Sequence, residues 1–127
     1  MQQSACFAAA INCMDGRTPI PAIDYVKKRF HVRYVDMITE PGPVRILSEK
    51  NDATQLQSIR RRLEISTWKH GSKSIAIAAH HDCAANPVDM ETQLQQLAQS
   101  MPTIRSWGFD KEILGVWVDE NWKLRRI

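Results

Sequence analysis

Three side chains near the start of the chain have types and a spacing that could do chemistry. Cys13, Asp15 and Arg17 alternate in the segment INCMDGR, residues 11–17, at the end of the apolar run ACFAAAIN. A cysteine is a soft metal ligand, and an aspartate is a hard ligand or a base. An arginine is a fixed cation that can hold a carboxylate through two hydrogen bonds. The segment therefore has the composition of a site.

A second pair of metal-binding residue types lies far along the chain. His80 and Cys83 form an H-x-x-C motif directly after the apolar run SIAIAA, residues 74–79. Two thiolates and one imidazole suit zinc, which binds Cys sulfur at roughly 2.3 Å and His nitrogen at roughly 2.0 Å and keeps a fourth position. Asp15 could fill that position or lie beside a zinc-bound water, and Arg17 could hold it off the metal.

The elements that must bring these residues together alternate between strand and helix. Apolar or β-branched runs predict strands over residues 5–12, 32–39, 74–79 and 112–119, and a hairpin edge strand over 122–127. Apolar positions three or four apart predict helices from Pro19 to about His31, over 52–70, and from Pro87 to about Met101. Thr18 and Asn86 are the expected caps, the segment EPGP (residues 40–43) breaks the second strand, and Pro102 disfavours continuation of the last helix.

This alternation predicts an α/β fold with a mostly parallel sheet. In such sheets ligands collect at the carboxyl ends of the strands. Cys13 follows the first predicted strand, and His80 and Cys83 follow the third. If these two strands are neighbours, the three ligands converge at one edge of the sheet.

Length and composition limit the other possibilities. A chain of 127 residues predicts one domain, residues 1–127. The net charge of +3 is spread along the chain without a basic stripe that has stacking aromatics, so we expect no nucleic-acid partner. No apolar run reaches the roughly 18 residues of a membrane span. Three cysteines and no secretory signal argue against a disulfide framework and for a reducing, cytoplasmic location.

The motif C-x-D-x-R after the first predicted strand, with H-x-x-C after a later one, resembles the β-class carbonic anhydrases. The resemblance covers nearly the whole chain, through GSKSIAIAAHHDC and the terminal ILGVWVDENWKL. It implies a sheet of order 2-1-3-4 with a fifth strand at one edge, flanking helices and pairing as dimers. It also implies zinc held by Cys13, His80 and Cys83, with Asp15 and Arg17 as the catalytic dyad. In a closed form Asp15 would be the fourth ligand.

The reaction that the resemblance implies is reversible hydration of CO2 to bicarbonate by zinc-bound hydroxide. This chain departs from the family pattern in three places. Cys13 lies too near the start for the usual N-terminal helical arm, so the chain is similar to a shortened member. The family's R-N-A-G-like segment is Glu40-Pro41-Gly42-Pro43 here, which replaces a positive charge and backbone donors with an acid and two prolines. The glycine that usually follows H-x-x-C is Ala84.

Other interpretations stay open on the sequence alone. A related zinc hydrolase acting on COS or CS2 would need nearly the same ligands, and so would a non-catalytic zinc-binding module. Cys13 and Cys83 could be small buried apolar residues or a disulfide. Asp15 and Arg17 could be only an ion pair that stabilises a turn.

Overall fold

One sheet of five strands runs through the molecule in the order β2-β1-β3-β4-β5. The computed structural model describes residues 6–127. The strands are β1 (Phe7–Cys13), β2 (Tyr34–Glu40), β3 (Ser74–His80), β4 (Glu112–Val118) and β5 (Leu124–Arg126). β1 to β4 pair in parallel, and β5 is antiparallel to β4 at the edge. The predicted α/β fold, its strand order and its edge strand are confirmed.

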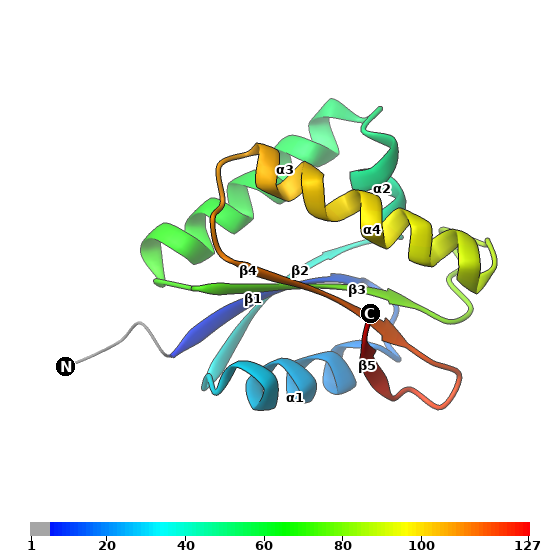
Figure 1. Cartoon of the computed structure of the whole chain (residues 1–127), viewed down its shortest axis with the longest axis horizontal. Helices are drawn as coiled ribbons and strands as arrows, with labels where there is room; N and C mark the ends of the chain where they lie inside the picture. Colours follow the sequence, from blue (N-terminus) through cyan, green and yellow to red (C-terminus); the bar gives the residue numbers. More distant parts are fainter. Residues whose placement is uncertain (1–5) are drawn as a thin grey trace.

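Helices cover both faces of this sheet (Figure 1). They are α1 (Pro19–Phe30), α2 (Pro43–Glu49), α3 (Ala53–Glu64), the π-helical turn η1 (Ile65–Lys69) and α4 (Met90–Ser106). Figure 1 shows α1 on one face and α2, α3 and α4 on the other. Among residues 6–127, each helix is too short or too polar to span a membrane.

The two central strands are buried on both faces, which explains their continuous apolar runs. β1 and β3 lie side by side, with Ala9 opposite Ile75 and Ile11 opposite Ile77. All four of these side chains are fully buried, and they belong to the main core beneath α2, α3 and α4. Because β1 and β3 are parallel neighbours, their carboxyl ends meet at one edge of the sheet.

The helix α2 is absent from the sequence prediction, which treated residues 40–43 only as a break. Gly42 takes a left-handed conformation with φ of 62° immediately before the helix, and Pro43 occupies the first helical turn. The helix then buries Val44, Ile46 and Leu47 in the core. The break therefore also begins a helix, because glycine permits the left-handed turn and proline has a φ suited to a first helical position.

Both predicted ends of the last long helix were wrong. α4 begins at Met90, because the Asp89 side chain accepts the Thr92 N–H at 2.8 Å, whereas Asn86 and Pro87 belong to the turn after Cys83. The helix also continues through Pro102 to Ser106. Tertiary contacts hold it there: the Thr103 hydroxyl donates to the Leu47 carbonyl of α2 at 2.8 Å.

The remaining predicted elements agree with the structure to within a few residues. Thr18 occupies the N-cap position of α1, although its hydroxyl donates to the backbone of the preceding turn instead of capping the helix. The helix expected over 52–70 is α3 followed by η1. The first predicted strand began at residue 5, which lies outside the described residues.

Candidate metal centre

Cys13, His80 and Cys83 come together at the carboxyl ends of β1 and β3. Cys13 is the last residue of β1 and His80 is the last residue of β3, while Cys83 follows in the next turn. One ligand atom from each of the three lies within 4.8 Å of the other two, and the two sulfur atoms are 3.9 Å apart. All three side chains are buried. The convergence expected from the parallel sheet is present.

The hydrogen bonding of His80 fits a metal ligand. Its Nδ1 lies 2.7 Å from the carbonyl oxygen of His81. A carbonyl only accepts hydrogen bonds, so Nδ1 carries the proton, and in the neutral ring Nε2 carries a lone pair. Nε2 is buried and has no hydrogen-bond partner among residues 6–127. A buried lone pair without a partner is costly unless a proton or a metal satisfies it.

The two thiols have different electrostatic surroundings. Burial raises the pKa of Cys13, but the His80 ring, when it also carries a proton on Nε2, and the backbone N–H groups of Gly42 and Asp15 outweigh it, so the pKa falls to about 7. Burial and the charge of Cys13 raise the pKa of Cys83, although the N–H groups of Ala85 and Asn86 oppose this rise. A cation in the cluster would compensate both thiolates. The donor set and its surroundings therefore fit zinc.

Asp15 and Arg17 form a bidentate ion pair beside this cluster. Arg17 Nη2 donates to Asp15 Oδ2 at 2.7 Å, and Arg17 Nε donates to Asp15 Oδ1 at 3.0 Å. The hydrogen bonds from Arg17 lower the pKa of Asp15 to about 2, against a smaller opposing effect of burial. Among the described residues, the tight group of possible ligands contains Cys13, His80 and Cys83 without Asp15. Asp15 is thus held by Arg17 and not by the cluster.

Arg17 also contacts two residues that the sequence analysis missed. Its Nη1 lies 3.3 Å from Asp82 Oδ2, and its Nη2 donates to the Asp82 carbonyl oxygen at 3.0 Å. Its guanidinium carbon lies 4.4 Å from the ring centroid of Trp122. Asp82 is inside the H-x-x-C motif and could have been considered as a partner, whereas nothing in the sequence connects Trp122 to Arg17.

The segment that departs from the family pattern still contacts the site. The Gly42 N–H lowers the pKa of Cys13, so one backbone donor is retained where the sequence suggested loss. The Glu40 carbonyl accepts the Met14 N–H at 3.0 Å, and the Glu40 carboxylate pairs with Arg62 of α3. The charge of the Glu40 carboxylate is therefore compensated by an arginine from another element.

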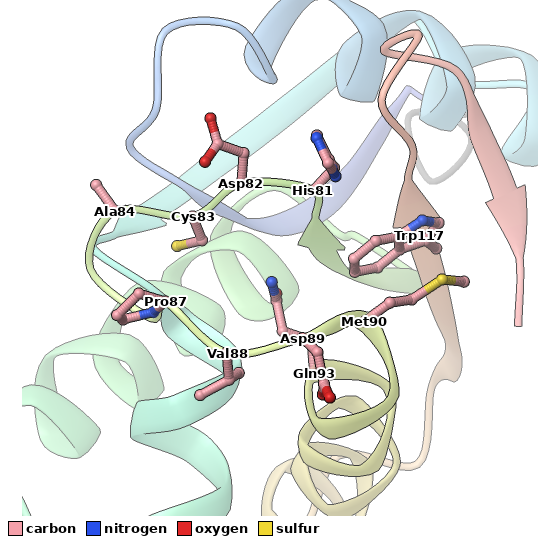
Figure 2. A pocket seen from close by; sticks show the side chains of 10 residues that line it. All are labelled: His81, Asp82, Cys83, Ala84, Pro87, Val88, Asp89, Met90, Gln93 and Trp117. Carbon is pink, nitrogen blue, oxygen red and sulfur yellow. The ribbon is translucent and has the colours of Figure 1, made fainter.

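A cavity of about 450 Å³ adjoins the motif on the side of β4. Figure 2 shows it between the loop after β3 and the start of α4, with Trp117 at one side. Cys83 lies on its wall, together with apolar side chains such as Val88 and Met90 and the carboxylate of Asp89. The cavity thus reaches one of the three candidate ligands from the surface.

A family model described as "Putative carbonic anhydrase" matches residues 3–127. No curated protein sequence matches the chain significantly. The β-carbonic anhydrase isoform I of the protozoan Trichomonas vaginalis aligns with a TM-score of 0.62 and 17% identity, over 98% of this chain and 82% of that one.

Two further solved structures align at a similar level. One is from a study of two tetrameric β-carbonic anhydrases of the ascomycete Sordaria macrospora, with a TM-score of 0.57 and 14% identity over 97% of this chain and 81% of that one. The other is the β-carbonic anhydrase CcaA, with a TM-score of 0.57 and 13% identity over 94% and 79%. At these identities the structural matches establish the shared fold.

Proposed function

The chain belongs to the carbonic anhydrase family whose model it matches over residues 3–127, and from this premise we propose that it is a zinc lyase. The reaction is the reversible hydration of CO2 to bicarbonate, carried out by one domain over residues 1–127. The observation that supports this most strongly is the buried cluster of Cys13, His80 and Cys83, in which His80 Nε2 has no partner among the described residues.

In this proposal Cys13, His80 and Cys83 hold the zinc ion. The His81 carbonyl fixes the tautomer of His80 by accepting its Nδ1–H, which leaves Nε2 for the metal. When bound, zinc supplies a Lewis acid that lowers the pKa of a water from about 15.7 to near neutrality.

Asp15 orients the attacking water in this mechanism. With a pKa of about 2, its carboxylate is ionised at neutral pH and is too weak a base to take the proton for itself. It instead accepts a hydrogen bond from the water and directs a lone pair toward the carbon of CO2. Arg17 keeps the carboxylate in place through its two hydrogen bonds. The proton released in the reaction passes to solvent or buffer.

We also propose a homodimer or a larger homo-oligomer in the cytoplasm. β2 is an outer strand of the sheet, and an unpaired strand edge favours association unless it is covered. Large apolar side chains are exposed as well, including Ile20 at 72% and Trp68 at 69%. The Sordaria macrospora relatives are described as tetrameric. Sedimentation at micromolar concentration tests this proposal, and a monomer would contradict it.

Stopped-flow CO2 hydration on protein with its zinc counted in the same sample tests the activity. We expect turnover that rises from neutral to alkaline pH and falls about a hundredfold in Asp15→Asn with zinc retained. The matched control is Asp24→Asn, because Asp24 is exposed on α1 and should not affect turnover. Stoichiometric zinc without CO2 turnover would contradict the proposal. Activity on COS or CS2 in that sample would indicate the related hydrolase, and inactivity on all three would indicate a non-catalytic zinc module.

A further inference from the structure

Besides Asp15, Arg17 contacts two residues that the proposed reaction does not use, Asp82 and Trp122. One edge of its guanidinium chelates Asp15, and the other contacts the side chain and the carbonyl of Asp82. The face of the guanidinium lies over Trp122 at 4.4 Å. The Arg17 side chain is 44% exposed, so solvent competes for its hydrogen bonds with Asp15, and further contacts would restrain the guanidinium more firmly.

Trp122 offers a rigid surface for this contact. It lies in the turn between β4 and β5, where the Asp119 carboxylate accepts the N–H groups of Asn121 and Lys123 at 2.9 and 3.0 Å. The Trp122 N–H itself donates to the Asp119 carbonyl at 2.9 Å. Figure 1 shows this hairpin at the sheet edge, folded toward the face covered by α1.

The backbone and the packing of Trp122 are both constrained. Its φ is 59°, a left-handed conformation that bulky residues rarely adopt, so the turn must hold it there. Its side chain packs against a small buried cluster of Ala78, Val116 and Val118. The Trp122 ring therefore packs against this buried cluster and also contacts the Arg17 guanidinium.

Asp82 is constrained in the same way. Its φ is 60°, in the turn between the candidate ligands His80 and Cys83. Its carbonyl and its carboxylate both contact Arg17, although the side chain is 70% exposed. The guanidinium thus connects three parts of the chain: the loop after β1, the H-x-x-C turn and the β4–β5 hairpin.

We propose that Trp122 and Asp82 are positioning residues that hold the Arg17 guanidinium in the plane in which it chelates Asp15. The carboxylate then stays paired with Arg17 instead of turning toward the Cys13–His80–Cys83 cluster. This inference depends on the proposed function in one respect: that function gives Asp15 and Arg17 their role in the reaction. The holding of Arg17 can be measured without turnover.

The test follows the exchange of the Arg17 Nε–H with solvent by nitrogen-15 NMR on the full chain, with the signal assigned by its loss in Arg17→Lys. This proton lies in the hydrogen bond to Asp15 Oδ1, so its exchange reports on the ion pair. Trp122→Leu keeps an apolar side chain in the same backbone constraint but removes the π face. We expect exchange about two- to fivefold faster in this variant, from the usual strength of an exposed cation–π contact. Trp122→Phe should lie between wild type and Trp122→Leu, since phenylalanine has a weaker π face.

Two more variants separate positioning from general destabilisation. Asp82→Ala should speed exchange of the Arg17 Nε–H although the Trp122 ring is still in place. This variant tests the inference even if Trp122→Leu does not fold. Trp68→Leu removes an exposed tryptophan elsewhere on the surface and should leave exchange unchanged. Unchanged Arg17 exchange in the Trp122 and Asp82 variants would overturn the inference, even if their melting temperatures fall. An inactive wild type that shows the expected exchange rates would refute the proposed function and leave the positioning intact.

Discussion

Replacing Cys83 with serine should separate the role of this residue in the fold from its role in metal binding. The Cys83 side chain is 4% exposed, and the backbone N–H groups of Ala85 and Asn86 face its sulfur. Serine is nearly the same size and its hydroxyl can accept the same N–H groups, so the metal-free protein should lose only about 1 kcal/mol of stability. A serine hydroxyl is a poor substitute for a thiolate on zinc, so metal binding should suffer far more.

The size of the effect follows from ligand linkage. Zinc at a thousandfold excess over its dissociation constant stabilises the folded state by about 4.1 kcal/mol if the unfolded chain does not bind it. For a domain of this size 1 kcal/mol corresponds to roughly 3–4 °C in melting temperature, so zinc should raise the wild-type Tm by roughly 12–16 °C. If the variant binds about a thousandfold more weakly, the same zinc concentration adds only about 0.4 kcal/mol, or roughly 1–2 °C.

Calorimetry with a chelator measures the stability of the metal-free protein, and calorimetry with zinc measures the zinc-dependent rise in Tm. Bound metal is counted in the same samples. Cys6→Ser is the matched control, because Cys6 precedes β1 and lies outside the cluster. It should keep the full zinc-dependent rise in Tm. A Cys83→Ser protein that still holds one zinc per chain and keeps that rise would refute the assignment of Cys83 as a ligand.

Three other perturbations give measurable outcomes. In metal-free protein the thiolate absorbance near 240 nm should rise with a midpoint near pH 7, below the usual cysteine range, because His80 and backbone N–H groups favour the charged form of Cys13; a single step near pH 9 would contradict this. Gln93→Leu removes the amide that donates to the buried His80 carbonyl at 2.8 Å. This change should weaken zinc binding about tenfold, as measured by competition with a chromophoric chelator. Unchanged affinity would show that this contact does not support His80 as a ligand. Gly115→Ala would bring a Cβ to 2.4 Å from Met101 Cε of α4 and should cost about 1 kcal/mol in urea unfolding; a gain in stability would show that the methionine moves away freely.

The parallel sheet and the convergence of the ligands were predictable because local patterns specify them. The alanine- and isoleucine-rich segments at 7–13 and 74–80 form continuous buried strands. Cys13 and His80 end those strands, so the geometry of a parallel sheet brings them together once the strands are neighbours. That adjacency depends on long-range packing, which local sequence patterns do not specify.

Features that depend on tertiary contacts were not predictable. Pro102 disfavours a helix locally, yet α4 continues beyond it to Ser106, because contacts such as that of Thr103 with α2 stabilise its last turns. The short helix α2 depends on Gly42 adopting a left-handed turn before a proline. The contact of Trp122 with Arg17 joins residues that are distant in the chain, through a turn whose left-handed tryptophan no propensity favours.

The order in which the cluster is assembled has a consequence for folding kinetics. The two sulfurs are 3.9 Å apart in space but 70 positions apart in the chain. During synthesis Cys13 emerges long before Cys83, and the two meet only after β1 and β3 have paired across the intervening helices and β2. Parallel pairing over such a distance is a slow step, so a bound metal would enter late as a cross-link between finished strands. A metal bound there would link the ends of the two strands and slow their separation, which would add to the kinetic stability of the domain.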